Sequence, residues 1–237
     1  MEKLRSDYYG EYGRQFLSNS DIGILINNPR QFGVPREDTK AMLEGRYFHT
    51  IILEPEKLRD FIIVDASTRN TNLYKSALES SGESMLLLKS EADELTALAN
   101  TLKGNMEVCD MVYAKGALYE EPTTGMVQGH MFKGKADIVT SDMVIDIKTT
   151  SDIMDFKWSA KKYNYDSQAY IYQTLFGKPL TFIAIDKTSH LIGIFTPSQD
   201  MIKRGEEKVE QALIVYNQFF GPSPTHDINQ YLIYQTI

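Results

Sequence analysis

The sequence is poor in cysteine and has no long apolar run, and each absence excludes a class of protein. Cys109 is the only cysteine among 237 residues, so neither an intramolecular disulfide nor a four-cysteine iron–sulfur cluster can form. No apolar segment approaches the roughly 20 residues that a membrane-spanning helix needs. The first residues, 1–12, are charged and aromatic, unlike a secretory signal. We therefore expect a cytoplasmic protein that does not associate with membranes.

The formal net charge is −7 at pH 7. An excess of acidic residues argues against a protein that coats nucleic acid in general, since such proteins are basic. It does not exclude an enzyme that contacts DNA only within one cleft, because a bound Mg²⁺ would add positive charge there.

The length fits one α/β domain with a sizeable core. No repeat, low-complexity tract or linker divides the chain, so we expect a single domain over residues 1–237, with its core at about 17–215 and a docked irregular tail at 221–237. No glycine-rich phosphate-binding loop of the kind found in helicases is present, which favours a protein that acts alone, without a helicase module.

Periodicity and capping patterns predict the order of the elements. We expect helices at 18–28, 40–53, 72–80, 90–102, 153–176 and 197–220, with a capping box at 90–93. We expect strands at 61–64, 85–88, 117–149, 180–185 and 190–196, with turns at Thr124-Gly125 and Ser141-Asp142. Strands in the middle of the chain with helices on either side favour a mixed central sheet covered by helices.

The most informative segment is a predicted β-hairpin at 135–149. Two apolar, β-branched runs flank residues 140–143, which have the composition of a turn. With the tightest loop at Ser141-Asp142, the numbers of paired residues sum to 283, so Asp137 lies opposite Asp146. Their Cβ atoms would be about 5 Å apart. Two carboxylates at that distance repel each other unless a cation lies between them.

Hard divalent ions such as Mg²⁺ and Mn²⁺ are held by one or two carboxylates, with water and substrate phosphate completing the shell. Alternation along the strand puts Lys148 on the same face as Asp146. There it can activate the attacking water or stabilise charge on a phosphate. The alternative is a surface hairpin whose solvated lysine only pairs with the aspartate. A register slip of one residue would break the geometry.

Further motifs surround the hairpin in a fixed order. Gly134-Lys-Ala-Asp137, Ile145-Asp-Ile-Lys-Thr-Thr150 and Tyr165-Asp-Ser-Gln168-Ala-Tyr-Ile-Tyr172 resemble the PD-(D/E)xK nuclease superfamily, most closely its RecB-like and exonuclease VIII (RecE) branch. Residues 45–55, with a histidine just before Leu-Glu-Pro, are similar to the first motif of that branch, and residues 17–22 with 28–32 look like its opening helix. The resemblance covers about 17–215 and implies a restriction-endonuclease-like fold.

The resemblance also implies roles for the matching residues. Asp137 and Asp146 would be metal ligands, together with the backbone carbonyl of Ile147, and Lys148 would be the catalytic lysine. His49 would be a further metal ligand or would orient the site. The alternative for this histidine is an ordinary core residue, because it lies in an apolar helical stretch at 41–53.

Three more groups of residues complete the predicted site. Gln168 and Tyr172, four residues apart on one helix face, would flank the site and touch DNA or the metal shell, unless this tyrosine-rich helix only packs against the sheet. Related enzymes often carry an acidic residue on the preceding strand, and Glu120 and Glu121 compete for that place. Lysines near the hairpin could grip phosphates or form a solvated face: Lys133, Lys135, Lys157, Lys161 and Lys162.

The resemblance implies a Mg²⁺- or Mn²⁺-dependent DNA exonuclease that hydrolyses phosphodiesters. Such enzymes resect duplex ends during recombination or repair and hand the exposed strand to a single-strand annealing protein. Many assemble as homo-oligomeric rings, and a phage or mobile-element origin would place this one in a bacterial or phage-infected cytoplasm. Two alternatives remain open: a single-strand- or structure-specific RecB-like nuclease, and a DNA-binding or assembly module that no longer cuts.

Overall fold

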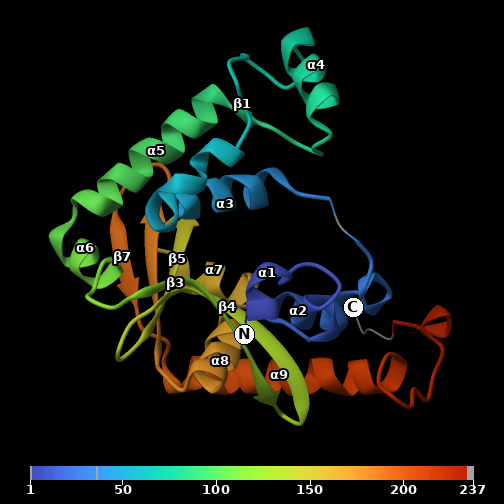
Figure 1. Ribbon diagram of the computed structural model, residues 1–237. Coiled ribbons are helices and arrows are strands. Elements are labelled where there is room, and N and C mark those ends of the chain that lie inside the picture. Colours follow the sequence, from blue (N-terminus) through green and yellow to red (C-terminus); the bar gives the residue numbers. More distant parts are fainter. Residues whose placement is uncertain (1, 36, 234–237) are drawn as a thin grey trace.

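A mixed five-stranded sheet forms the centre of the computed structural model, which describes residues 2–35 and 37–233 (Figure 1). Its strand order is β3-β4-β5-β6-β7. β5 and β6 are parallel and the other neighbouring strands are antiparallel. The strands are β3 (Leu118–Val127), β4 (His130–Val139), β5 (Val144–Thr150), β6 (Leu180–Asp186) and β7 (Ile192–Phe195).

Helices cover both faces of the sheet. The helices of the described residues are α1 (Glu2–Ser6), α2 (Asn19–Asn27), α3 (Lys40–Leu53), α4 (Asn72–Ser81), α5 (Lys89–Gly104), α6 (Met106–Val112), α7 (Phe156–Lys162), α8 (Tyr165–Phe176) and α9 (Gln199–Phe219), of which α4 lies apart from the sheet. In the residues that the structure describes, none of them is long and apolar enough to cross a bilayer. The predicted fold class, α/β with a mixed central sheet flanked by helices, is confirmed.

Two cores lie on opposite sides of the sheet. Val144 and Phe182 pack against α2, α8 and α9 on one face, whereas Ile145, Ile147 and Ile183 pack against α3, α5 and α6 on the other. Figure 1 shows α3 and α5 on one side of the strands and α8 and α9 on the other. Ile145 and Ile147 share a face, as the alternation of β5 predicts, so Asp146 and Lys148 between them point the other way.

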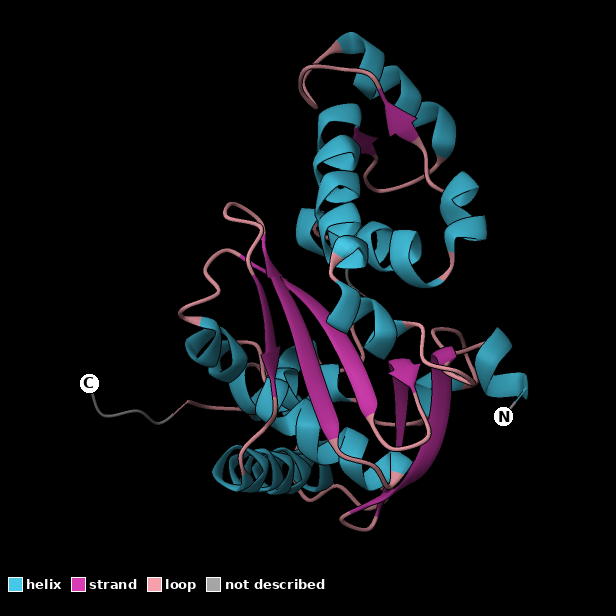
Figure 2. Cartoon of the chain, turned by 90° about the vertical axis from the view of Figure 1, so that its left-hand side faces the viewer, coloured by secondary structure: helices cyan, strands magenta, loops and turns pink. Residues whose placement is uncertain are grey.

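A small lobe extends from the α3–α5 side (Figure 2). It contains α4 and two short parallel strands, β1 (Ile63–Val64) and β2 (Leu87–Leu88), around its own cluster of buried side chains. An ion pair joins it to the rest of the chain, because Arg69 lies 2.6 Å from Glu91 at the start of α5. Lys40 at the start of α3 lies 2.9 Å from the same carboxylate and so links α3 to α5 at this point.

The expected turn at Thr124-Gly125 is wrong. β3 runs without a break to Val127, and the chain reverses at Gln128-Gly129. Both turn residues have positive φ, 47° and 81°, which is the backbone of the two-residue type I′ turns that join twisted antiparallel strands. Gly129 supplies one such residue readily, but a glutamine at the other is an uncommon choice.

Two helix boundaries also differ from expectation. The predicted helix at 153–176 is two helices, α7 and α8, because Asn164 between them is left-handed, with φ of 57°. α5 begins at Lys89 rather than at the predicted capping box, since the carboxylate of Glu91 accepts the backbone N–H of Leu88 at 3.0 Å. One acidic side chain in the first turn thus shifts the start of this helix.

Candidate active site

The predicted hairpin register is confirmed for the two pairs next to the turn. Ile138 pairs with Ile145 and Val139 with Val144, and the residue numbers of each pair sum to 283. The ladder ends there, so Asp137 and Asp146 are not a ladder pair as expected. Instead, the backbone N–H of Ile147 donates to Oδ2 of Asp137 at 2.7 Å. The β4–β5 ladder therefore stops one residue before the two aspartates, where β4 and β5 separate.

A second irregularity lies directly across β4. Glu120 stands opposite Asp137 in the β3–β4 register but is skipped by the ladder, and its φ is 49°. Side-chain alternation breaks at the same level, because Ala136 belongs to the core under α8 whereas Ile138 belongs to the core under α3. A left-handed conformation at a non-glycine residue costs of the order of 1–3 kcal/mol and is concentrated at functional sites.

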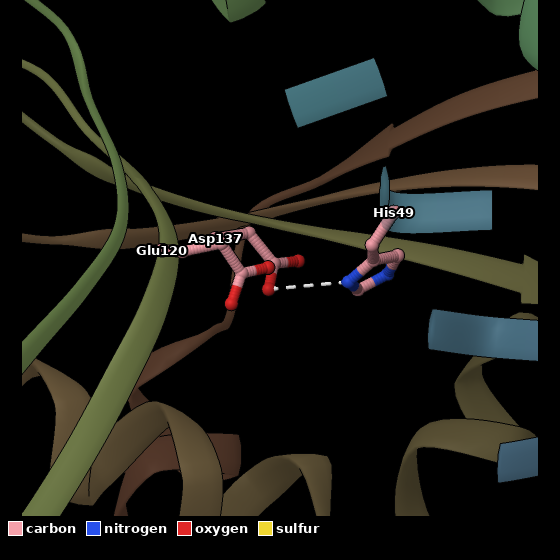
Figure 3. Close-up of side chains that lie close together, drawn as sticks. All are labelled: His49, Glu120 and Asp137. Carbon is pink, nitrogen blue, oxygen red and sulfur yellow. Dashed lines mark ion pairs between the residues drawn. The ribbon is translucent and has the colours of Figure 1, made fainter. Parts of the chain in front are cut away.

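The left-handed backbone of Glu120 brings three potential metal ligands together (Figure 3). One ligand atom each of His49, Glu120 and Asp137 lies within 4.8 Å of the others. His49 comes from α3, Glu120 from β3 and Asp137 from β4, so three elements far apart in sequence meet here. Glu121, the competing candidate, points elsewhere and pairs with Arg5.

Hydrogen bonding fixes the orientation of the histidine ring. Nε2 of His49 donates to the backbone carbonyl of Ile147 at 2.8 Å, while Nδ1 lies 3.4 Å from Oδ1 of Asp137. This leaves Nδ1 as the nitrogen that faces the carboxylates. A ring nitrogen held by a carbonyl on one side and free for a metal on the other is the usual arrangement of a ligating histidine.

Asp146 lies at the centre of a second set of contacts. Nζ of Lys148 lies 2.5 Å from Oδ2 of Asp146, and the side-chain amide of Gln168 donates to Oδ1. Lys148 also lies 5.0 Å above the ring centre of Tyr165. α8 thus supplies an amide that orients the carboxylate and an aromatic face that supports the ammonium group.

A pocket of about 460 Å³ opens beside these groups. His49, Ile147 and Lys148 form one part of its wall, and Ser159, Tyr163 and Tyr165 form another. The intervening wall is Thr149-Thr150-Ser151, which continues from β5. Lys148 therefore borders a space large enough for part of a nucleotide chain.

Comparison with protein families identifies the one to which this chain belongs. The family described as "PDDEXK-like domain of unknown function (DUF3799)" matches residues 27–221. The chain belongs to this family. Membership places it in the PD-(D/E)xK superfamily, as its motifs predict, and supports a nuclease.

A solved structure shares the fold of this PDDEXK-like chain. A protein from Eubacterium rectale, provisionally described as an exonuclease, is similar over 98% of this chain and 94% of its own, with 17% identity and a TM-score of 0.66. At that identity the similarity shows the fold alone. The structure of SSO0001, with 18% identity over 90% of this chain and 81% of its own, has a TM-score of 0.38 and carries no argument. No curated protein matches.

The buried groups of the PDDEXK-like site fit a divalent cation. Oδ2 of Asp146 is buried, and the ammonium group of Lys148 lies 2.5 Å from it. His49, Glu120 and Asp137 add an imidazole and two further carboxylates, a donor set suited to Mg²⁺ or Mn²⁺. The carbonyl of Ile147, a predicted ligand, is engaged by His49.

Burial and charge set the protonation of these groups. Burial raises the pKa of Asp146 to about 6, against the opposing charge of Lys148, and the neighbouring Asp137 adds to the increase. Burial alone would also raise the pKa of Asp137, but the charge and hydrogen bond of His49 lower it below its ordinary value. Burial opposes the charge of His49, yet Asp137 outweighs it and raises the histidine pKa to about 9. A cation would replace the proton of the imidazolium as the partner of these carboxylates.

The remaining predicted residues make contacts of different kinds around the site. The hydroxyl of Tyr172 donates to the backbone carbonyl of Lys135 at 2.9 Å, which gives it a structural contact behind the site. The ammonium group of Lys135 pairs with Glu120. Lys133 is buried, and its Nζ donates to the carbonyl of Tyr8 at 2.7 Å. Its predicted role as a phosphate contact does not agree with this burial, because the segment around Tyr8 covers it.

Tyr165 and Tyr163 were not predicted to line the site. Both border the pocket that contains Lys148. The sequence feature that could have indicated Tyr165 as a site residue is its position at the start of the motif that contains Gln168. Lys157, Lys161 and Lys162 are exposed on α7, the helix that also carries Ser159 of the pocket wall.

Proposed function

We propose that this chain is a divalent-metal-dependent DNA exonuclease that degrades duplex DNA from its ends. The observation that carries the proposal is the meeting of Asp137, Asp146 and Lys148 at the point where β4 and β5 separate, with His49 and Glu120 beside them. Buried carboxylates next to a lysine in a pocket are a costly arrangement unless they hold a cation and a phosphate.

Each residue has a distinct part in this proposal. His49, Glu120, Asp137 and Asp146 would hold one or two Mg²⁺ or Mn²⁺ ions. When bound, such an ion supplies positive charge against the scissile phosphate and lowers the pKa of a bound water, so that the water becomes a nucleophile at neutral pH. Lys148, held by Asp146 and supported by Tyr165, would stabilise the negative charge that builds up on the phosphate.

Action on ends is part of the proposal because the Eubacterium rectale protein that shares the fold is provisionally described as an exonuclease. In the same proposal, the single strand produced by resection would pass to an annealing protein during recombination or repair, and several copies of the chain could enclose the duplex. The metal site and the lysine do not depend on these wider steps, so they can be tested first.

The decisive test uses a linear duplex labelled with different fluorophores at its 5′ and 3′ ends, beside a covalently closed circle. Each is incubated with Mg²⁺, Mn²⁺ or EDTA. We expect metal-dependent loss of the linear duplex with the circle intact, and the order in which the labels are released gives the polarity. Asp146→Asn is the matched control, since asparagine keeps the shape of the side chain but removes its charge.

Other outcomes select among the alternatives. Cutting of the circle would replace the exonuclease proposal by an endonuclease. Cleavage of single-stranded or flap DNA alone would indicate a RecB-like, structure-specific nuclease. DNA binding without any cleavage in either metal would indicate a module that keeps the fold and does not cut.

A further inference from the structure

α7 and the residue after it carry an unusual combination of side chains. Residues 156–163 read Phe-Lys-Trp-Ser-Ala-Lys-Lys-Tyr, with three lysines, three aromatic residues and no acidic residue. The chain as a whole has a net charge of −7. This short stretch is therefore a local basic segment, and its cations alternate with aromatic rings.

Two of the rings are exposed to solvent. Trp158, the only tryptophan in the chain, is 59% exposed, and Tyr163 is 55% exposed. Phe156 in the same stretch is buried and stacks on Phe195, with 4.3 Å between ring centres. Packing of α7 against the sheet therefore uses Phe156 and leaves Trp158 and Tyr163 available for a ligand.

Each exposed ring has a lysine beside it. Nζ of Lys157 lies 5.4 Å from the ring centre of Trp158, and Nζ of Lys162 lies 5.3 Å from that of Tyr163. An exposed π-face with an adjacent ammonium group suits a ligand that presents a flat ring and an anion at short spacing. Single-stranded nucleic acid presents both once per nucleotide.

The stretch lies at the edge of the catalytic pocket. Ser159 and Tyr163, one helical turn apart, line the pocket that also contains His49 and Lys148. Trp158 directly precedes Ser159, so it lies on an adjacent face of the helix, where its ring is exposed beside the residues that line the pocket. A strand that runs from Trp158 past Tyr163 would enter the space beside Lys148.

We propose that residues 156–163 are a stacking platform for an unpaired DNA strand that leads into the catalytic pocket. Bases stack on Trp158 and Tyr163, and Lys157, Lys161 and Lys162 neutralise phosphates. The inference rests on the proposed nuclease function and specifies its substrate at the site: a single strand, obtained from a duplex only after the terminal base pairs open. Overhanging ends are then better substrates than blunt ends.

The single tryptophan allows a direct test in the intact chain. Trp158 fluorescence is titrated with a ten-nucleotide oligothymidylate in EDTA, so that no cleavage occurs, and with an abasic oligonucleotide of the same length. We expect saturable quenching by the oligothymidylate and about fivefold or greater weakening of binding for the abasic strand. Fluorescence anisotropy of a labelled oligonucleotide gives the same affinities without relying on the tryptophan.

Substitutions separate the contribution of base stacking to DNA affinity from the contribution of charge. Trp158→Ala and Tyr163→Ala should each weaken oligothymidylate binding about 5- to 100-fold, whereas Trp158→Phe should retain most of the affinity. The Lys157→Ala, Lys161→Ala and Lys162→Ala triple variant should lower the slope of log affinity against log salt by about 2. Leu73→Ala, at a side chain that is also 59% exposed but lies on α4, is the control and should leave binding unchanged.

The outcomes distinguish this inference from the proposed function. Unchanged oligothymidylate affinity in Trp158→Ala and Tyr163→Ala, in a chain that still cleaves DNA, would overturn the platform and leave the nuclease standing. The absence of both DNA binding and cleavage in the unaltered chain would overturn both. Weaker binding and a higher KM on overhanging ends in the two alanine variants, with kcat nearly unchanged, would support the platform.

Discussion

The carboxylate of Asp137 accepts the backbone N–H of Ile147 at 2.7 Å while its other oxygen lies 3.4 Å from the ring of His49. One side chain therefore both ends the β4–β5 ladder and faces the proposed metal site. These two tasks differ in what they require. The first needs only an acceptor oxygen, and the second needs negative charge.

Asp137→Asn and Asp137→Ala should separate the two tasks. Asparagine can still accept the N–H of Ile147, so the melting temperature should change little, while Mn²⁺ affinity falls at least about tenfold. Alanine also leaves a buried N–H without a partner, which costs about 1–3 kcal/mol of unfolding free energy. Titration calorimetry with Mn²⁺ and thermal unfolding measure the two effects. Equal Mn²⁺ binding by both variants and the unaltered chain would remove Asp137 from the ligand set.

Lys148→Met should lower kcat by at least about 10²-fold, because the ammonium group that faces the phosphate is lost. Mn²⁺ affinity should fall much less than in Asp137→Asn. Arginine at this position should not restore the rate, since its planar guanidinium does not match a point charge held between Asp146 and Tyr165. Single-turnover cleavage of labelled DNA gives the rate. A kcat within twofold of the unaltered chain would exclude a catalytic role for the lysine.

Glu120→Gln and Glu121→Gln form a matched pair of adjacent substitutions. Glu120 lies with His49 and Asp137, whereas Glu121 pairs with a half-exposed Arg5. We expect the first change to weaken Mn²⁺ binding at least about tenfold and to suppress cleavage. The second should alter neither, because exposed ion pairs contribute little. The reverse result would show that β3 presents the other glutamate in the metal-bound protein.

Gln168→Ala and Tyr172→Phe test two residues on one face of α8. Gln168 donates to the buried Asp146, so its loss should lower kcat and, because a buried carboxylate oxygen loses its partner, should also cost about 1–3 kcal/mol of unfolding free energy. The hydroxyl of Tyr172 contacts only the Lys135 carbonyl among the described residues, so phenylalanine should cost about 1 kcal/mol of stability and leave cleavage intact. A large loss of activity in Tyr172→Phe at unchanged stability would instead support contact with the substrate.

The pKa of Glu91 predicts how low pH affects the link between the α4 lobe and the rest of the chain. Burial would raise its pKa, but hydrogen bonds from Arg69, the Leu88 N–H and Lys40 outweigh it and lower the pKa from 4.5 to about 2. A lowered pKa in the folded state stabilises the fold fully above about pH 4.5, and this contribution is lost as the pH falls toward 2.

Glu91→Gln should therefore reduce the unfolding free energy by the order of 2 kcal/mol at pH 7, with the two stability curves converging near pH 2. Urea unfolding between pH 2 and 7 measures the difference. Asp93→Asn, which removes an exposed i,i+4 partner of Lys89, is the control with no measurable change expected. A constant difference between Glu91→Gln and the unaltered chain at every pH would contradict the assignment.

Much of the fold could be predicted from local patterns. The helix at 40–53 and the hairpin register around Ser141-Asp142 agree with the structure because capping, turn composition and β-branched runs act within a few residues. These signals place His49 on its helix and Lys148 on its strand. The same locality explains why the break at Asn164 was missed, since the long apolar periodicity of 153–176 outweighed a single left-handed residue.

The geometry between the motifs could not be predicted in this way. The choice between Glu120 and Glu121 depends on a left-handed glutamate, for which the sequence carries no signature. The end of the ladder at Ile138 depends on a carboxylate that accepts a backbone N–H from the next strand. Both arise from packing between β3, β4 and β5, and such contacts are visible only when the strands are placed side by side.

The left-handed backbone of Glu120 has a consequence for how this position can vary. Glycine and asparagine adopt that conformation with less strain than glutamate does, yet neither carries a carboxylate toward His49 and Asp137. Selection for thermal stability alone would therefore draw residue 120 away from glutamate, while selection for metal binding would hold it there. Directed-evolution libraries screened only for folding would be expected to lose the acid at this position first.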